Sequence, residues 1–231
     1  LGIIFLDKKY PQMDIYKGLH YLKLSANQNN PIVLYYISQI DFDGILIPKD
    51  IRQCIYYLEL AAEQFDDKAM LFLGEIYLFG LNQKVDKSKA VYYLELASNQ
   101  NNSQAQYYLG ICYYYCINDI IIKKVRFSEI PTKLKYIMIK RKKIGQKYIL
   151  LASKNQNRQA NFAHGYFLHV GEILKKDIYS AANLYRDAIN VANIFAKNNL
   201  GVIYKNGSEK IKKDIARAIS YFKEAIHEKN D

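Results

Sequence analysis

The histidines are the side chains best suited to acid–base or metal chemistry, and their spacing supports neither. The four of them, His20, His164, His169 and His227, are scattered over the chain. A zinc hydrolase motif needs His-Glu-x-x-His, and a phosphate loop needs a glycine-rich run that ends in Gly-Lys-Ser/Thr. The sequence contains neither motif. We therefore expect no catalytic residues, no cofactor site and no metal site.

The cysteines also lack the spacing of a reactive set. Cys54, Cys112 and Cys116 are odd in number, and no Cys-x-x-Cys motif occurs. A disulfide framework needs more cysteines in an even number, and a metal site needs more ligands. Because cysteines without such roles are among the most buried residues, we expect buried thiols.

Two short motifs carry weaker chemical signals. Asp41-Phe42-Asp43-Gly44 resembles the start of a calcium loop, but the later ligand positions are missing, and we interpret it as a turn between helices. Asn101-Asn102-Ser103 and Asn206-Gly207-Ser208 fit the Asn-x-Ser glycosylation sequon. With 18 Asn and 11 Ser or Thr among 231 residues, roughly one sequon is expected by chance. Glycosylation, and with it a secretory location, therefore stays open.

The elements that position these residues follow from an internal repeat. Tyr21-Leu22, Tyr57-Leu58 and Tyr93-Leu94 begin similar segments that are 36 residues apart (57 − 21 and 93 − 57). A fixed period in this range indicates one supersecondary unit that is copied and stacked along the chain. Such units bury a core only against their neighbours, and the stack presents a long surface.

Each unit contains two helical stretches, because apolar and small residues recur at i, i+3, i+4 and i+7. The third unit shows both most clearly, with Ala69, Leu73, Gly74, Tyr77 and Gly80, then Ala90, Tyr93, Leu94 and Ala97. A glycine inside a helix costs about 1 kcal/mol relative to alanine. We expect Gly74 to offset this cost by a close approach of the second helix, with Ala90 and Ala97 facing it.

Six units follow from the pattern, near residues 1–30, 31–66, 67–102, 103–157, 158–193 and 194–231. The recurring Leu-Gly-x-x-Tyr-x-x-Gly, followed by Lys-Ala-x-x-Tyr-x-x-Ala, resembles the Sel-1-like repeat, a relative of the tetratricopeptide repeat. The resemblance covers essentially the whole chain and departs from the pattern at Ser38, Asp41, Cys116 and His164. It implies an all-α fold: one domain, a right-handed superhelical solenoid of about six helix-turn-helix repeats. Because such arrays need polar capping units, we expect this chain to be part of a longer array.

The resemblance also implies a binding surface. In the tetratricopeptide fold the first helix of each pair lines the concave face, so first-helix residues off the packing pattern are expected to contact protein or peptide partners. They are Tyr35, Phe42, Leu71, Glu75, Leu78, Tyr107, Ile111, Tyr114, Phe162, Tyr166, His169, Phe195, Asn198 and Lys205. Tyrosine suits this role because it combines a large contact area with a hydrogen-bonding tip. In the alternative interpretation, some of these tyrosines pack against neighbouring helices.

The positive charge is concentrated in the long fourth unit. The net charge is +11, and residues 117–147 supply +8 of it, with ten Lys or Arg and two Asp or Glu. We expect an insertion near 117–138, with a loop over 117–131 and a helix that starts near Thr132. The basic residues of this region are Lys123, Lys124, Arg126, Lys140, Arg141, Lys142 and Lys143. Such blocks are usually solvated, but an acidic partner or an anionic surface could dock there. The uneven distribution argues against a nucleic-acid groove.

These observations favour a non-catalytic scaffold or adaptor that binds partner proteins or peptides. The resemblance includes one narrower class, the luminal adaptor of the endoplasmic-reticulum (ERAD) ubiquitin ligase. One alternative is a secreted or cell-envelope hydrolase of β-lactamase type, which the family's cysteine-rich branch suggests but three scattered cysteines disfavour. Another is a basic loop that binds RNA or an anionic membrane. No apolar run reaches the roughly 20 residues of a membrane span, and the compartment stays open between cytoplasm and endoplasmic reticulum.

Overall fold

The computed structural model describes residue 6 and residues 14–115, 132–171, 173–191 and 193–227. Within that part of the chain the regular elements are helices, accompanied by one isolated bridge between Ser208 and Ile211. The prediction of an all-α fold is therefore confirmed. The contacts divide the chain into two compact units, Leu1–Ala105 and Gln106–Asp231, and each is described by itself.

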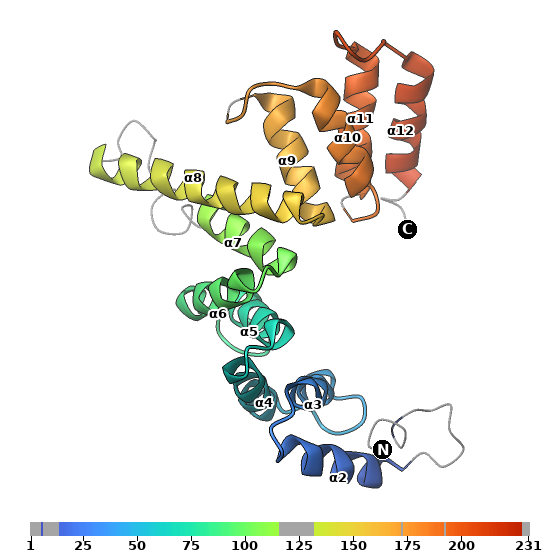
Figure 1. Cartoon of the computed structure of the whole chain (residues 1–231). Coiled ribbons are helices and arrows are strands. Elements are labelled where there is room, and N and C mark those ends of the chain that lie inside the picture. The colour runs from blue at the N-terminus through green and yellow to red at the C-terminus, as the bar shows by residue number, and fades with distance from the viewer. Residues whose placement is uncertain (1–5, 7–13, 116–131, 172, 192, 228–231) are drawn as a thin grey trace. The chain divides into compact units, whose positions relative to one another are not determined.

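The first unit is built from helices that pack in pairs. Its helices are α2 (Ile15–Ala26), α3 (Pro31–Asp43), α4 (Ile51–Glu63), α5 (Asp67–Phe79) and α6 (Lys87–Asn99). The closest packing joins α3 to α4 and α5 to α6, and α4 also packs on α5 (Figure 1). Each pair therefore buries one face within itself and another against the next pair.

The second unit repeats this arrangement with one long helix. It contains α8 (Thr132–Lys154), α9 (Arg158–Val170), α10 (Ile178–Ala188), α11 (Asn193–Asn206) and α12 (Ile215–His227), together with most of α7 (Ser103–Tyr115). The pairs α9–α10 and α11–α12 pack most closely. Helix α8, yellow in Figure 1, begins at Thr132 as predicted. The predicted loop over 117–131 lies outside the described residues.

The helix boundaries recur with the period of the sequence. Asp14, Asp50 and Asp86, each 36 residues after the last, cap the second helix of their units and accept hydrogen bonds from first-turn backbone N–H groups. At the other end of the first helices, Gly44 and Gly80 adopt left-handed φ values of 68° and 65°, which cost glycine little. The interpretation of residues 41–44 as a turn was wrong in part, because Asp41–Asp43 form the last turn of α3 and only Gly44 leaves the helix.

The helices of a pair approach closely at glycines, as predicted for Gly74. A Cβ atom added to Gly74 would lie 2.6 Å from the Leu94 side chain, so the residue that fills the space is Leu94; Ala90 and Ala97 are fully buried beside it. A Cβ on Gly145 would lie 2.5 Å from the backbone nitrogen of Tyr114, so α7 and α8 also approach each other closely at a glycine.

A second recurring contact is a stacked tyrosine pair between the two helices of a repeat. Tyr77 and Tyr93 stack with ring centroids 5.8 Å apart, and Tyr204 stacks on Tyr221 at the same distance. In the second repeat, Asp41 stands where Tyr77 stands in the third. Its side chain is only 5% exposed and its Oδ2 has no hydrogen-bond partner, so burial, reinforced by Asp50, raises its pKa to about 6.

Candidate partner-binding pocket

Three first helices of the second unit place a row of side chains around one pocket. The spacing of four residues puts Tyr107 and Ile111 on one face of α7, as it puts Phe162 and Tyr166 on one face of α9. Together with residues of α11 they line a pocket of about 340 Å³. Six predicted partner-binding residues line it: Tyr107, Ile111, Phe162, Tyr166, Phe195 and Asn198. The same pocket has four further lining residues that the sequence did not suggest: Ile149, Ala163, Phe167 and Asn199.

The pocket has a packed floor and an exposed aromatic rim. Ile149 and Phe167 are only 1% and 3% exposed, whereas Tyr166 is 48% and Phe195 67% exposed. The Phe162 ring links the two levels, because its centroid lies 6.3 Å from Phe195 and 5.6 Å from the buried ring of Tyr185. Large aromatic side chains held in place from below but open to solvent can bury area against a partner at little entropic cost.

The polar groups of the pocket are neutral. Among its lining residues only Asn198, Asn199 and the tyrosine hydroxyls are polar, and Asn198 is exposed. Asn199 shares a side-chain hydrogen bond with the hydroxyl of Tyr185, whose pKa is raised by burial. An exposed amide can donate and accept, so Asn198 suits the main chain of a peptide.

Other predicted residues of the second unit lie beside the pocket. The Tyr114 ring is 5.4 Å from that of Phe167, and Lys142 Nζ lies 5.6 Å from the Tyr114 centroid. His169 turns away, with its Nδ1 3.3 Å from the Tyr185 hydroxyl, and burial lowers its pKa. Lys205 is exposed on α11.

Two predicted residues of the first unit, Tyr35 and Phe42, take part in a separate aromatic contact. The Phe72 ring, which the sequence did not single out, meets Tyr35 at 6.4 Å and Phe42 at 4.9 Å. Leu71, Glu75 and Leu78 are half-buried on α5. The rings of Tyr35, Phe42 and Phe72 pack α3 against α5, which is the packing role that the alternative interpretation gave to some of the tyrosines.

The basic residues divide between described and undescribed segments. Lys140, Arg141, Lys142 and Lys143 follow one another on α8, and all four are exposed. Lys123, Lys124 and Arg126 lie outside the described residues. The described part of the region therefore presents a solvated, positively charged stretch of helix.

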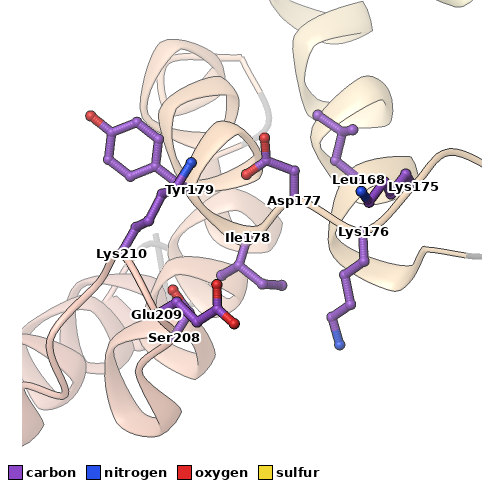
Figure 2. A pocket seen from close by; sticks show the side chains of 9 residues that line it. All are labelled: Leu168, Lys175, Lys176, Asp177, Ile178, Tyr179, Ser208, Glu209 and Lys210. Atoms are coloured by element: carbon purple, nitrogen blue, oxygen red, sulfur yellow. The ribbon is translucent and has the colours of Figure 1, made fainter.

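A second hollow of about 650 Å³ lies between the loops that precede α10 and α12 (Figure 2). Its charged lining residues are Lys175, Lys176, Asp177, Glu209 and Lys210. The lysines do not converge: Figure 2 shows Lys176 pointing away from Asp177, and Lys210 extending toward Tyr179. Asp177 is occupied as the cap of α10, where its Oδ2 accepts a hydrogen bond from the Ser180 hydroxyl. The arrangement offers no focused anion or cation site.

His164, Cys54 and Cys112 are part of the helix packing, whereas His20 and His227 are exposed. Ser153 Oγ lies 3.0 Å from His164 Nδ1 and donates to Asn161 Oδ1 at 2.8 Å, so His164 serves as a donor to Ser153 in this network. Cys54 is a buried free thiol, and burial raises its pKa to about 12; Cys112 is buried as well. Cys116 lies outside the described residues. The described residues contain no group of three or more His, Cys, Asp or Glu that could hold a metal ion.

Comparison with known families accounts for this architecture. The family model described as Sel1 repeat matches residues 7–30, 33–64, 67–102, 103–116, 158–190 and 194–230. The chain belongs to the Sel1 repeat family. The six matches confirm the prediction of about six repeats, and the interval between the fourth and fifth matches contains the long basic segment. No curated protein sequence matches the chain.

Solved structures show the same fold at low sequence identity. A Sel1 repeat protein from Oxalobacter formigenes is 19% identical with a TM-score of 0.75 over 98% of this chain and 60% of its own. A protective antigen present in uropathogenic Escherichia coli strains is 19% identical with a TM-score of 0.54, over 98% of this chain and 52% of its own. An immunity protein from Pseudomonas aeruginosa is 13% identical with a TM-score of 0.50, over 91% of this chain and 73% of its own. The Sel1 chain thus spans about half to three fifths of the first two neighbours.

Proposed function

We propose that this Sel1 repeat chain is a non-catalytic scaffold that binds a peptide segment or a domain of a partner protein on its first helices. Sel1 repeat proteins are generally protein-interaction scaffolds. The observation that carries the proposal for this chain is the pocket on α7, α9 and α11. Side chains from three consecutive first helices converge there, and two of the exposed ones, Tyr166 and Phe195, are aromatic.

The pocket has the properties of a protein interface more than those of a catalytic centre. Its rim exposes Tyr166 and Phe195, and aromatic side chains are enriched where interfaces concentrate binding energy. Its volume lies at the small end of the range of ligand pockets, roughly 300–1,000 Å³, which suits one or two side chains of a partner. No charged group lines it that could act as an acid, a base or a nucleophile.

Site-specific photo-crosslinking tests the proposal. A benzophenone amino acid placed at Phe195 should trap a partner protein in extracts of cells that express the chain. The matched control carries the same probe at Tyr179, which is 46% exposed on α10 outside this pocket. Equal labelling at both positions, or no adduct at position 195, would contradict the proposed binding face.

The luminal adaptor of the endoplasmic-reticulum ubiquitin ligase is the narrower form of this proposal. Asn101 is exposed in a turn with a φ of 62°, and Asn206 is exposed at the end of α11, so both sequons are accessible. Expression behind a secretory signal should add glycans that Asn101→Gln and Asn206→Gln remove. A chain that passes through the secretory pathway without glycans would argue against this form.

The two alternatives from the sequence have less support. The hydrolase of the cysteine-rich branch pairs cysteines between helices, whereas Cys54 is a free thiol buried in the core. Binding of RNA or of an anionic membrane by the basic segment is compatible with the exposed residues of α8, and no helix among the described residues is long and apolar enough to cross a bilayer. Both RNA and vesicles therefore enter the experiments below as competing ligands.

A further inference from the structure

The helices that line the pocket carry charged side chains of a single sign. The four helices that contribute lining residues, α7, α8, α9 and α11, contain no Asp or Glu. They carry eleven Lys or Arg, of which eight are on α8, one on α9 and two on α11. The second unit holds 23 Lys or Arg against 10 Asp or Glu, for a net +13, whereas the first holds 10 against 12, for −2. A cleft in a field of one sign attracts ligands of the opposite sign.

Lysine side chains lie near the pocket but do not line it. Lys142 lies over Tyr114, and Tyr114 contacts Phe167 in the pocket wall, so two side chains, Tyr114 and Phe167, separate this charge from the cavity. On α11, Lys205 follows Asn198 by seven residues, which places it on the same helical face about 10 Å away. Lys197 differs, because its Nζ is 3.2 Å from Glu224 Oε2 and its charge is compensated there.

From this arrangement we propose, building on the scaffold function above, that the pocket binds a peptide with an apolar anchor side chain flanked by acidic residues. The anchor enters between Ile111, Ile149 and Ala163, and the carboxylates lie outside the pocket, toward Lys142 and Lys205. Charge complementarity of this kind sets the partner and the association rate, while the buried anchor supplies most of the affinity.

A nucleic acid fits the same surface less well. Grooves for single strands line the path of the backbone with cations and leave flat aromatic faces open for base stacking. Here the lining residues include no Lys or Arg that could contact a phosphate backbone, and of the aromatic lining residues only Tyr166 and Phe195 are exposed. A membrane surface is flat, and it would not fill a recessed pocket with aliphatic walls.

Selection of a random phage-displayed 12-residue peptide library on the full chain tests this inference. We expect the enriched peptides to combine one or two large apolar residues with Asp or Glu, and to bind less tightly as salt rises, because the flanking contacts are screened. A single-stranded oligouridine and vesicles containing phosphatidylserine are the competing ligands. Enrichment of neutral or basic peptides, tighter binding of the oligouridine, or tighter binding of the vesicles would overturn the proposal.

Matched variants separate the anchor from the charge. Phe195→Ala and Tyr166→Ala should weaken the selected peptide about tenfold or more, while the control Tyr179→Ala leaves it unchanged. Lys142→Glu with Lys205→Glu should weaken it several-fold, and the charge-matched control, Lys175→Glu with Lys223→Glu, should have little effect. Circular dichroism and thermal unfolding confirm that each variant is folded.

The outcomes distinguish this inference from the proposed function. If the anchor variants weaken binding but the charge variants behave like their control, the scaffold function stands and the acidic partner is refuted. If the anchor variants also behave like Tyr179→Ala, or if no peptide is enriched, the pocket is not the binding site and both proposals fail.

Discussion

Replacement of Asp41 by asparagine should make the stability of the first unit less sensitive to pH. Asp41 is 5% exposed on α3, and its Oδ2 has no hydrogen-bond partner. Burial is the main cause of its raised pKa, the negative charge of Asp50 adds to it, and Lys23 opposes it weakly. The folded chain therefore holds the proton of Asp41 more tightly than the unfolded chain does.

The direction and the size of the effect on the free energy of unfolding follow from the difference between the folded and unfolded pKa of Asp41. Because the folded pKa is raised from 3.8 to about 6, the neutral carboxyl carries no penalty below pH 3.8, and stability is lost as the pH rises through 6. A pKa moved by this amount corresponds to about 3 kcal/mol once the group is ionised in both states. Asparagine keeps the shape and removes the charge, so any cost of its own amide is the same at every pH.

The assay is urea unfolding of the wild-type chain and of Asp41→Asn across the pH range. The quantity to compare is the difference between the two free energies of unfolding, because it cancels the titration of all other groups. We expect this difference to move by about 3 kcal/mol in favour of Asp41→Asn between pH 3.5 and 7.5. A difference that does not depend on pH, or one that moves toward the wild type, would refute the buried-carboxylate reasoning. Asp43→Asn, an exposed neighbour on the same helix, is the control.

Two further substitutions test the packing of the repeats. Gly145→Ala should lower the free energy of unfolding by about 2 kcal/mol, because the new Cβ would lie 2.5 Å from the Tyr114 nitrogen and 2.7 Å from the Gly110 oxygen. This clash outweighs the better helix propensity of alanine. A free energy of unfolding that is unchanged or higher would contradict the close contact. Phe65→Asn should raise the free energy of unfolding by about 0.5–1 kcal/mol, because Phe65 is 73% exposed and has a φ of 62°, a left-handed conformation that asparagine adopts more easily. Asn101 occupies the same position one repeat later. A lower free energy of unfolding would show that the phenyl ring makes stabilising contacts.

The fold was predictable because the sequence states the same unit several times. Spacing of 36 residues located the helix pairs, and the glycine at Gly74 located the close approach of its pair. The capping residues Asp14, Asp50 and Asp86 have the same spacing of 36 residues. They could have located the starts of the second helices, but the prediction relied on apolar residues alone. The side chains that pack against the next helix could not be assigned so simply. Ala90 and Ala97 were predicted to face Gly74, whereas the side chain that contacts it is that of Leu94.

The pocket could be predicted only in part. First-helix register identified Phe162, Tyr166 and Phe195, because residues of one helical face are fixed by spacing. Ile149 comes from a second helix. Whether a second-helix residue reaches this pocket depends on how the helix pairs pack on one another, and no local sequence pattern encodes that packing. Helical register alone also predicted His169 as a binding residue, although its side chain contacts Tyr185 and does not line the pocket.

The most direct measurement of the central claim is methyl NMR of the isoleucine-labelled chain during titration with a peptide selected on it. Ile111 and Ile149 lie in the pocket, and Ile219 is an exposed isoleucine of α12 outside it. If the first helices bind partners through this pocket, the methyl signals of Ile111 and Ile149 shift at saturation and that of Ile219 does not. Shifts at Ile219 with no change at Ile111 and Ile149 would contradict the claim.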